Sequence, residues 1–363
     1  MRARSLAAIA LVAAVQVGCT SSASPSSASP SAAPGSTPTP FTSSVVSTPT
    51  VLLPPATPTG SPAALPVQEY PVPTGSHPHD VAPARDGGVW YTAQASGRLG
   101  WFDPATGAGS LMDLGAGSAP HGVVVGPDGA PWITDGGLNA ILRVDPLTQA
   151  IKRYPLPPGT PNVNLNTAVF GADNALWFTG QAGYIGTVYP SSTSADVQEA
   201  PRGPGPYGIC ATPSGDVYFA SLAGNYLGAT DPETGSASDV LVPPTANAGP
   251  RRCWSDSHGR IWISEWNVGQ VGVYDPGAGS WREWKLPGDK PMAYAVFVDD
   301  KDIVWLTDFG ADAIVRFDPT TETFTTYSLP THPAEVRQLN GRPGEVWGAE
   351  SAADKVVVVR TGS

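Results

Sequence analysis

The protein has 363 residues, of which 14% are charged, and its formal net charge at pH 7 is -11. Nucleic acids and anionic membrane surfaces select basic patches, so this acidic composition argues against both as partners. The 41 glycines and 40 prolines predict frequent turns and exclude a fold built from long charged helices.

Residues 1–19 have the pattern of a bacterial lipoprotein-type signal peptide. Two arginines precede an apolar run that is too short to span a membrane, and small residues lead to Cys19. The Gly18-Cys19 pair is similar to a lipoprotein box, although Gln16 stands where an aliphatic residue is usual. We therefore expect export and lipidation of Cys19, with an anchor on the outer side of the cytoplasmic membrane. Plain secretion is the alternative.

Residues 20–66 are dominated by Ser, Ala, Pro and Thr. Such a segment cannot bury enough apolar surface to offset the entropy lost on ordering. It predicts a disordered tether that leads to one folded domain, residues 67–360. The only membrane contact that we expect is the lipid anchor.

A large aromatic residue recurs through this domain at intervals of 42, 45, 41, 44, 43 and 42 residues. A period in the low forties, with glycine-rich turns and short β-branched runs, is typical of propeller blades of four strands. We therefore predict an all-β, seven-bladed β-propeller in which these aromatics pack between blades. They are Trp90, Trp132, Trp177, Tyr218, Trp262, Trp305 and Trp347.

The seventh unit lacks a fourth strand, because the sequence ends soon after its third strand, residues 355–360. Residues 67–73 resemble the fourth strands of other units, such as residues 152–156 and 283–287. We expect this N-terminal strand to complete the last blade, which would leave no open edge in the ring.

Two rings of side chains are expected at one end of the propeller, where each inner strand begins and the next strand ends. The first ring lies about eleven residues before each aromatic: His79, His121, Asn166, Tyr207, Arg251, Met292 or Tyr294, and Val336 or Arg337. The second follows three residues after it: Ala93, Asp135, Gly180, Ser221, Glu265, Asp308 and Glu350. Their variation between blades is typical of a binding site on a symmetric scaffold, and also of unconstrained loops.

Several of these residues have candidate chemistry. His79 and His121, at equivalent positions of neighbouring blades, can act as bases or metal ligands, or can be ordinary solvated histidines. The four acids of the second ring can bind a hard cation such as magnesium, or form a hydrated acidic rim. Arg251 and Arg252 can hold a carboxylate or carbonyl of a ligand, or neutralise that rim. We expect substrate contacts from Asn166, Tyr207, Arg251 and Tyr294.

Residues 120–135 contain Pro-His-Gly-Val, Gly-Pro-Asp-Gly and Trp-Ile-Thr-Asp, and they resemble the blade repeat of the streptogramin lyase (virginiamycin B lyase) family. The resemblance spans roughly residues 67–360. It implies a magnesium-assisted C–O lyase that opens a cyclic depsipeptide ester by elimination. It further implies that His121 is the base and that His79 contacts the substrate.

The magnesium ligands are less well matched. The family has a glutamate two residues before its base, and Ala119 stands there in this sequence. Asp135 is the nearest match to the second carboxylate, and Glu265 is a further candidate ligand. Two other functions remain open: a non-catalytic exported propeller that binds a ligand or protein, and a propeller lactonase with Asn166 and Glu265 as metal ligands. We expect a monomer that takes a small molecule or cyclic peptide at its axis.

Cys210 and Cys253 lie one blade apart, at similar repeat positions. In an oxidising compartment they can form a disulfide between neighbouring blades. Two buried free thiols are the alternative.

Overall fold

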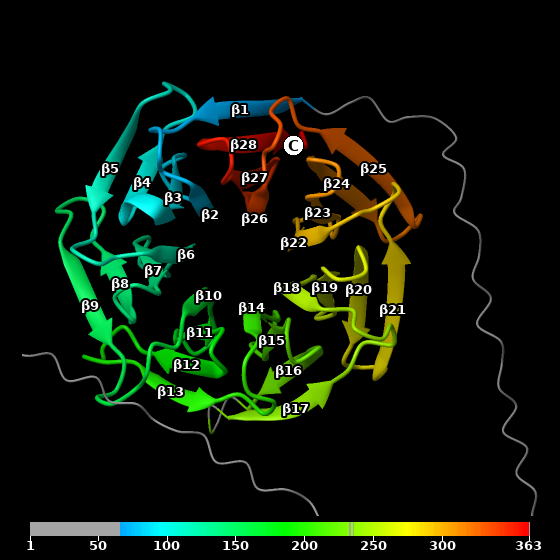
Figure 1. Ribbon diagram of the computed structural model, residues 1–363, viewed down its shortest axis with the longest axis horizontal. Coiled ribbons are helices and arrows are strands. Elements are labelled where there is room, and N and C mark those ends of the chain that lie inside the picture. The colour runs from blue at the N-terminus through cyan, green and yellow to red at the C-terminus, as the bar shows by residue number, and fades with distance from the viewer. Residues whose placement is uncertain (1–65, 232–233, 235, 363) are drawn as a thin grey trace, which may run out of the picture. The chain divides into compact units, whose positions relative to one another are not determined.

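The computed structural model describes residues 66–362, except residues 232, 233 and 235. The expected signal peptide, Cys19 and all but the last residue of the expected tether lie outside these described residues. Within them, 28 strands form seven antiparallel sheets of four strands. Figure 1 shows the sheets as blades around a common axis, so the predicted seven-bladed β-propeller is confirmed. No helix in the described part of the chain is long and apolar enough to cross a membrane.

Each blade runs from an innermost strand at the axis to an outermost strand at the rim (Figure 1). The innermost strands are β2 (Pro78–Pro83), β6 (Pro120–Val125), β10 (Leu165–Phe170), β14 (Pro206–Ala211), β18 (Pro250–Ser255), β22 (Ala293–Val298) and β26 (Val336–Arg342). The second strands are β3 (Val89–Ala93), β7 (Pro131–Asp135), β11 (Leu176–Gly180), β15 (Val217–Ser221), β19 (Ile261–Glu265), β23 (Val304–Asp308) and β27 (Glu345–Glu350).

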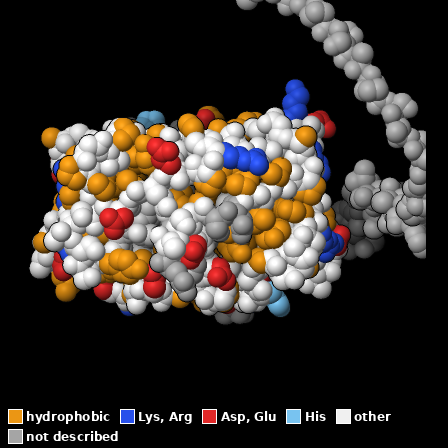
Figure 2. Space-filling view, turned by 90° about the horizontal axis from the view of Figure 1, so that it is seen from below, with side chains coloured by type: hydrophobic (Ala, Val, Ile, Leu, Met, Phe, Trp, Pro, Cys, Tyr) orange, Lys and Arg blue, Asp and Glu red, His pale blue; other side chains and the backbone are white. Residues whose placement is uncertain are grey.

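The remaining strands complete the blades. The third strands are β4 (Arg98–Phe102), β8 (Ala140–Val144), β12 (Tyr184–Val188), β16 (Tyr226–Thr230), β20 (Gln270–Asp275), β24 (Ala313–Asp318) and β28 (Lys355–Arg360). The outermost strands are β5 (Gly109–Asp113), β9 (Ile151–Pro155), β13 (Asp196–Glu199), β17 (Ala237–Leu241), β21 (Ser280–Lys285), β25 (Thr323–Ser328) and β1 (Val67–Pro71). Figure 2 shows the propeller from the side, where acidic side chains are scattered among hydrophobic ones.

The repeated aromatics of the second strands pack in the wedges between blades, as predicted. Trp347, for example, lies in one cluster with Val81 and Val89 of the next blade. Two of the buried indoles also have hydrogen-bonded N–H groups: Trp262 donates to Asp256 at 2.9 Å and Trp305 to Asp299 at 2.8 Å. The aromatic period therefore reflects packing between blades.

Every innermost strand has a β-bulge at the same place, just after its first residue. A bulge frees backbone groups from the ladder and turns side chains toward new directions. In the first blade the freed N–H of Asp80 donates to Thr92 Oγ1 at 3.0 Å, and that hydroxyl donates to the carbonyl of His121 at 2.7 Å. Thr134, Thr179 and Ser264 bridge their neighbouring blades in the same way. These hydroxyls therefore set the spacing of the bulged residues around the axis.

The ring is closed by β1, which pairs with β28 along all five of its residues. Glu69 of β1 accepts hydrogen bonds from Lys355 Nζ and Thr331 Oγ1, each at 2.6 Å. The ring of Tyr70 lies 4.8 Å from that of Phe102 and 5.9 Å from that of Trp347. The predicted closure by an N-terminal strand is thus confirmed.

Removal of β1 is expected to destabilise the whole propeller, because it exposes the edge of β28 and the inter-blade aromatics beneath Tyr70. A chain that starts at Val72 should melt at least about 5 °C below one that starts at Val67. Differential scanning calorimetry makes the comparison, and the chain that starts at Val67 is the control because it keeps every strand. Equal melting temperatures would contradict the closure.

Two buried glutamates end the second strands of the fifth and seventh blades. Glu265 is fully buried and lies over Gly272 of β20. Burial raises its pKa to about 9, and the nearby carboxylate of Glu283 adds to the rise. Glu350 is the counterpart: burial and the charge of Glu69 raise its pKa to about 8. Both side chains are therefore protonated at neutral pH.

This raised pKa makes stability depend on pH in a defined direction. Unfolded, Glu265 titrates at its ordinary value of 4.5, so its contribution to stability is complete below that pH and is lost as the pH rises through about 9. Glu265→Gln, which cannot ionise, should therefore melt above the wild-type protein at pH 9 and show no such gain at pH 4. The exposed Glu199→Gln is the control, and thermal melts across this range provide the measurement. A gain for Glu265→Gln that does not grow with pH would contradict the assignment.

Candidate functional site

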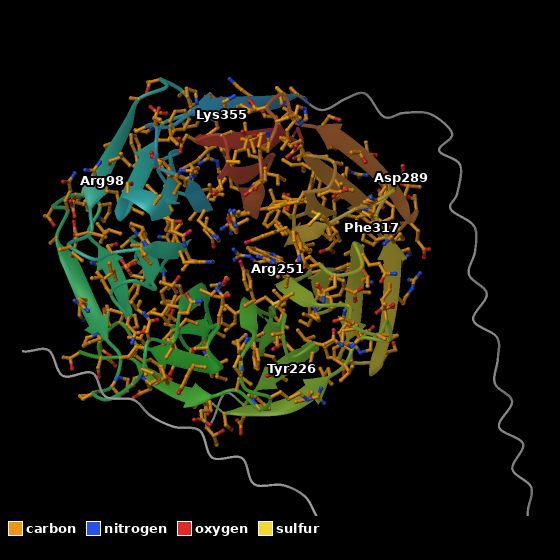
Figure 3. The ribbon with its side chains drawn as sticks, viewed as in Figure 1. Arg98, Tyr226, Arg251, Asp289, Phe317 and Lys355 are labelled. Carbon is orange, nitrogen blue, oxygen red and sulfur yellow. The ribbon has the colours of Figure 1, made fainter. Side chains whose placement is uncertain are left out.

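The first residue of each bulge forms the ring that the sequence predicted near the axis. In the first blade, Pro78 pairs with Ala93, and the next residue, His79, belongs to the ring. Ala293 and Val336 occupy the position of Pro78 in the sixth and seventh blades, because they pair with Asp308 and Glu350. Tyr294 and Arg337 therefore occupy the two positions that the sequence left open. The ring is His79, His121, Asn166, Tyr207, Arg251, Tyr294 and Arg337, and Figure 3 shows Arg251 near the centre of the propeller.

His79 and His121 lie side by side in this ring, with ring centroids 3.7 Å apart. Their exposed fractions are only 3% and 6%. Burial, together with the charge of Arg252, holds the pKa of His79 well below its ordinary value. Burial and the proximity of His79 lower the pKa of His121 in the same way. Both imidazoles are therefore neutral at pH 7.

Asp80 and Arg252 form a buried ion pair that joins β2 to β18. Asp80 Oδ1 accepts from Arg252 Nη2 at 2.8 Å, and Oδ2 accepts from Nη1 at 3.3 Å. The same Oδ1 lies 2.8 Å from His79 Nδ1. Because an ionised carboxylate only accepts hydrogen bonds, this contact places the proton of neutral His79 on Nδ1. Nε2 of His79 therefore carries the lone pair.

A second chain of hydrogen bonds sets the proton of His121. Arg252 Nη1 donates to Thr167 Oγ1 at 2.6 Å, and Thr167 in turn donates to Asn166 Oδ1 at 2.8 Å. A guanidinium can only donate, so each hydrogen bond in this chain runs from Arg252 toward Asn166. The amide oxygen of Asn166 is therefore the acceptor from Thr167, and Asn166 Nδ2 donates to His121 Nε2 at 3.1 Å. The proton of His121 then lies on Nδ1, which has no partner among the described residues.

Sequence reasoning missed most of the residues that organise these histidines. Asp80, Thr167, Arg252 and Gln338 are the second residues of their bulges, one position after the ring. Of these four, only Arg252 was predicted from the sequence, as a residue that could hold a ligand or neutralise the acidic rim. The other three could have been found in the sequence, because each lies one position after a ring residue. These four residues contribute polar groups to the lining of an otherwise largely apolar cavity of about 140 Å³, formed by the innermost strands.

Cys210 and Cys253 also line this cavity, on neighbouring innermost strands. Both are buried free thiols, so the structure has the second of the two states that the sequence allowed. Burial raises the pKa of the Cys210 thiol well above its ordinary value. That thiol is therefore protonated and a poor nucleophile at neutral pH.

The four acids of the second ring do not form a hydrated rim, because all are buried. No three of them come close enough together among the described residues to form a metal-binding group. Asp135 accepts from the backbone N–H groups of Ala119 and Leu138, both at 2.9 Å, and from the Ser118 hydroxyl. Asp308 accepts from the backbone of Met292 and Gly310, both at 2.8 Å. Glu265 and Glu350 instead face glutamates of the outermost strands.

The magnesium site implied by the resemblance does not fit these side chains. Ala119 offers no oxygen ligand, and both oxygens of Asp135 are already hydrogen-bonded. Within the described residues, the one group with metal-ligating atoms close together is His79, Asp80 and His121, whose atoms lie within 4.8 Å of one another. Asp80 is paired with Arg252 there, so a cation would have to compete with a guanidinium.

The ion pair between Asp80 and Arg252 predicts a large loss of stability when one partner is removed. Asp80→Asn leaves a buried guanidinium unpaired and should lower the free energy of unfolding by about 3–5 kcal/mol, whereas Asp80→Asn with Arg252→Met should recover part of it. Asp128→Asn, which breaks the partly exposed pair with Arg143, should cost no more than about 1 kcal/mol. Urea denaturation measures all three. Equal losses for Asp80→Asn and Asp128→Asn would contradict the prediction.

Comparisons with known proteins agree with the fold. The structure of a streptogramin B lyase superposes with a TM-score of 0.74 at 22% identity, covering 82% of this chain and 97% of that one. A catalytically inactive virginiamycin B lyase variant from Staphylococcus aureus, solved with quinupristin, gives 0.75 at 21% identity, covering 82% and 100%. An extracellular domain of BT4673, a two component system protein from B. thetaiotaomicron, gives 0.66 at 14% identity, covering 82% and 43%.

At these identities the structural likeness shows the fold alone. A comparison of the sequence with curated proteins gives no match. The sequence model of the Virginiamycin B lyase family matches residues 66–359, which include all seven blades. The chain therefore belongs to the virginiamycin B lyase family.

Proposed function

We propose that the axial end of the propeller binds a small molecule or cyclic peptide and opens an ester or lactone in it by eliminating a carbon–oxygen bond. The observation that carries this proposal is the pair of neutral imidazoles, 3.7 Å apart, whose tautomers are set by buried partners. One imidazole offers a lone pair and the other an N–H group. Together they can remove a proton and stabilise the charge that develops on the substrate.

His79 is the better-placed base, although the family resemblance implies His121 for that role. No hydrogen bond from the described residues reaches His79 Nε2, whereas the lone pair of His121 Nε2 is engaged by Asn166. Asp80 accepts from His79 Nδ1 and would stabilise the imidazolium formed when Nε2 takes a proton. Asp80 is thus a positioning residue, and Arg252 holds its carboxylate in place.

In the proposed reaction, His79 Nε2 takes a proton from a carbon alpha to a carbonyl. The electron pair forms a double bond to the adjacent carbon, whose bond to the ester oxygen breaks, and the ester leaves as a carboxylate. His121 Nδ1–H donates to the carbonyl oxygen on which negative charge develops. His79 then returns its proton to solvent.

A second candidate is a non-catalytic propeller that binds a ligand at the same place. Ala119 and the fully hydrogen-bonded Asp135 favour it, because they remove the carboxylates that the family resemblance requires for its metal. In this case the histidines would contribute affinity only.

We also propose that the protein is exported and anchored through a lipid on Cys19. The pattern of residues 1–19 supports export, and one structural relative is an extracellular domain. Labelling with a radioactive fatty acid in the native host tests the anchor: Cys19→Ala should carry no label.

Quinupristin is the first probe, since a relative was solved with it. Elimination opens its ring without a change in mass, whereas hydrolysis adds one water, so mass spectrometry separates the two reactions. We expect ring opening at unchanged mass that survives EDTA, and that falls at least about a hundredfold in His79→Gln. Because the pKa of His79 is lowered, His79 should stay neutral and the rate of ring opening should be the same at pH 7 and pH 6.

The exposed His332, which pairs with Asp312, provides the control variant His332→Gln. Full turnover by His79→Gln, or loss of turnover with EDTA, would contradict the proposed base or the metal-independent route. Binding of quinupristin without any ring opening would support the second candidate instead.

A further inference from the structure

Arg251 differs from the other two arginines at the axial end of the propeller. Arg252 is paired with Asp80, and Arg337 donates to Glu335 at 2.6 Å. No carboxylate of the described residues pairs with Arg251, although its side chain is partly buried. An unpaired, partly desolvated guanidinium is costly, and proteins keep such groups where a ligand supplies the opposite charge.

Aromatic rings surround the guanidinium instead. Its Cζ lies 3.7 Å from the ring centroid of Tyr294, 4.4 Å from that of Tyr207 and 4.8 Å from that of Trp266. Arg251 Nη2 donates to Tyr207 Oη at 3.0 Å, and the two tyrosine hydroxyls lie 2.6 Å apart. These contacts hold the guanidinium in one orientation and make the walls around it apolar. We call this group of four residues the Arg251 cage.

Two buried N–H groups, one in the cage and one on His121, lack acceptors among the described residues. Arg251 Nε and His121 Nδ1 have no hydrogen-bond partner among the described residues. Both residues adjoin Tyr207: its ring centroid is 6.0 Å from that of His121 and 4.4 Å from Arg251 Cζ. A buried donor without an acceptor costs free energy, and an oxygen ligand that reached both groups would recover it.

The charges favour an anion at this place. Among the described residues, two carboxylates, Asp80 and Glu335, pair with the three arginines Arg251, Arg252 and Arg337, and both histidines are neutral. One positive charge therefore remains at the axis of a protein whose net charge is -11. A local positive site in an acidic protein selects and orients anionic ligands.

We propose that the Arg251 cage is a binding site for a carboxylate group on an apolar or aromatic ligand. A planar carboxylate matches the fork of a guanidinium, and the three aromatic walls accept the apolar part of such a ligand better than they accept a strongly hydrated phosphate. The source of this ligand rests on the proposed function, because elimination would create a carboxylate on the product at this site. The binding itself does not depend on that reaction.

Benzoate titrated into the full-length protein at pH 7 tests the site by isothermal titration calorimetry. We expect benzoate to bind, and to bind more tightly than its neutral isostere benzamide and than inorganic phosphate. Arg251→Met should weaken benzoate binding about tenfold to a hundredfold. Arg98→Met is the matched control and should leave it unchanged, since Arg98 is an exposed arginine far from the axis (Figure 3).

Arg251→Lys keeps the charge without the planar fork and should weaken benzoate binding as well, and it decides the question if Arg251→Met fails to fold. Absence of benzoate binding to the wild-type protein, equal affinity for benzamide, or wild-type affinity in the Arg251 variants would overturn the proposal. Benzoate binding without any ring opening of quinupristin would count against the elimination and leave the carboxylate site standing.

Discussion

The buried ion pair between Asp80 and Arg252 is the interaction on which the axial end of this propeller depends. It joins blades that are far apart in sequence, and each partner directs one histidine. Asp80 holds His79 directly, whereas Arg252 acts on His121 through Thr167 and Asn166. A carboxylate that only accepts and a guanidinium that only donates fix the direction of every hydrogen bond between them. The two imidazoles are thus left with complementary groups, a lone pair on one and an N–H on the other.

The β-bulges explain how a repeated scaffold supports such an irregular network. Each bulge presents two successive residues near the axis, and a Thr or Ser of the second strand in five blades accepts the freed N–H. The Thr or Ser hydroxyl and the backbone N–H recur from blade to blade, and neither group depends on which ligand is bound. The side chains of the bulge are consequently free to differ between blades. Binding residues can therefore vary without loss of the ring.

The axial end of this propeller has a positive charge surplus, whereas the family resemblance implies acidic ligands for a magnesium ion. Magnesium requires clustered oxygen ligands, but here the second-ring acids serve as turn acceptors or as protonated partners of outer-strand glutamates. The arginines leave a positive surplus in the same region. These residues support an anionic ligand and a reaction without a metal ion.

The sequence by itself determined the fold, because the aromatic period, the glycine-rich turns and the strand-like segment at residues 67–73 are local or periodic signals. It also identified the ring from His79 to Arg251, since one fixed offset from each aromatic locates it. Only the tertiary structure decided that Tyr294 and Arg337 complete the ring and that Asp80 meets Arg252. It likewise showed that backbone N–H groups occupy Asp135 and that Glu265 faces Glu283 of an outermost strand. Those outcomes depend on bulges and on contacts across the ring, which spacing along the chain does not encode.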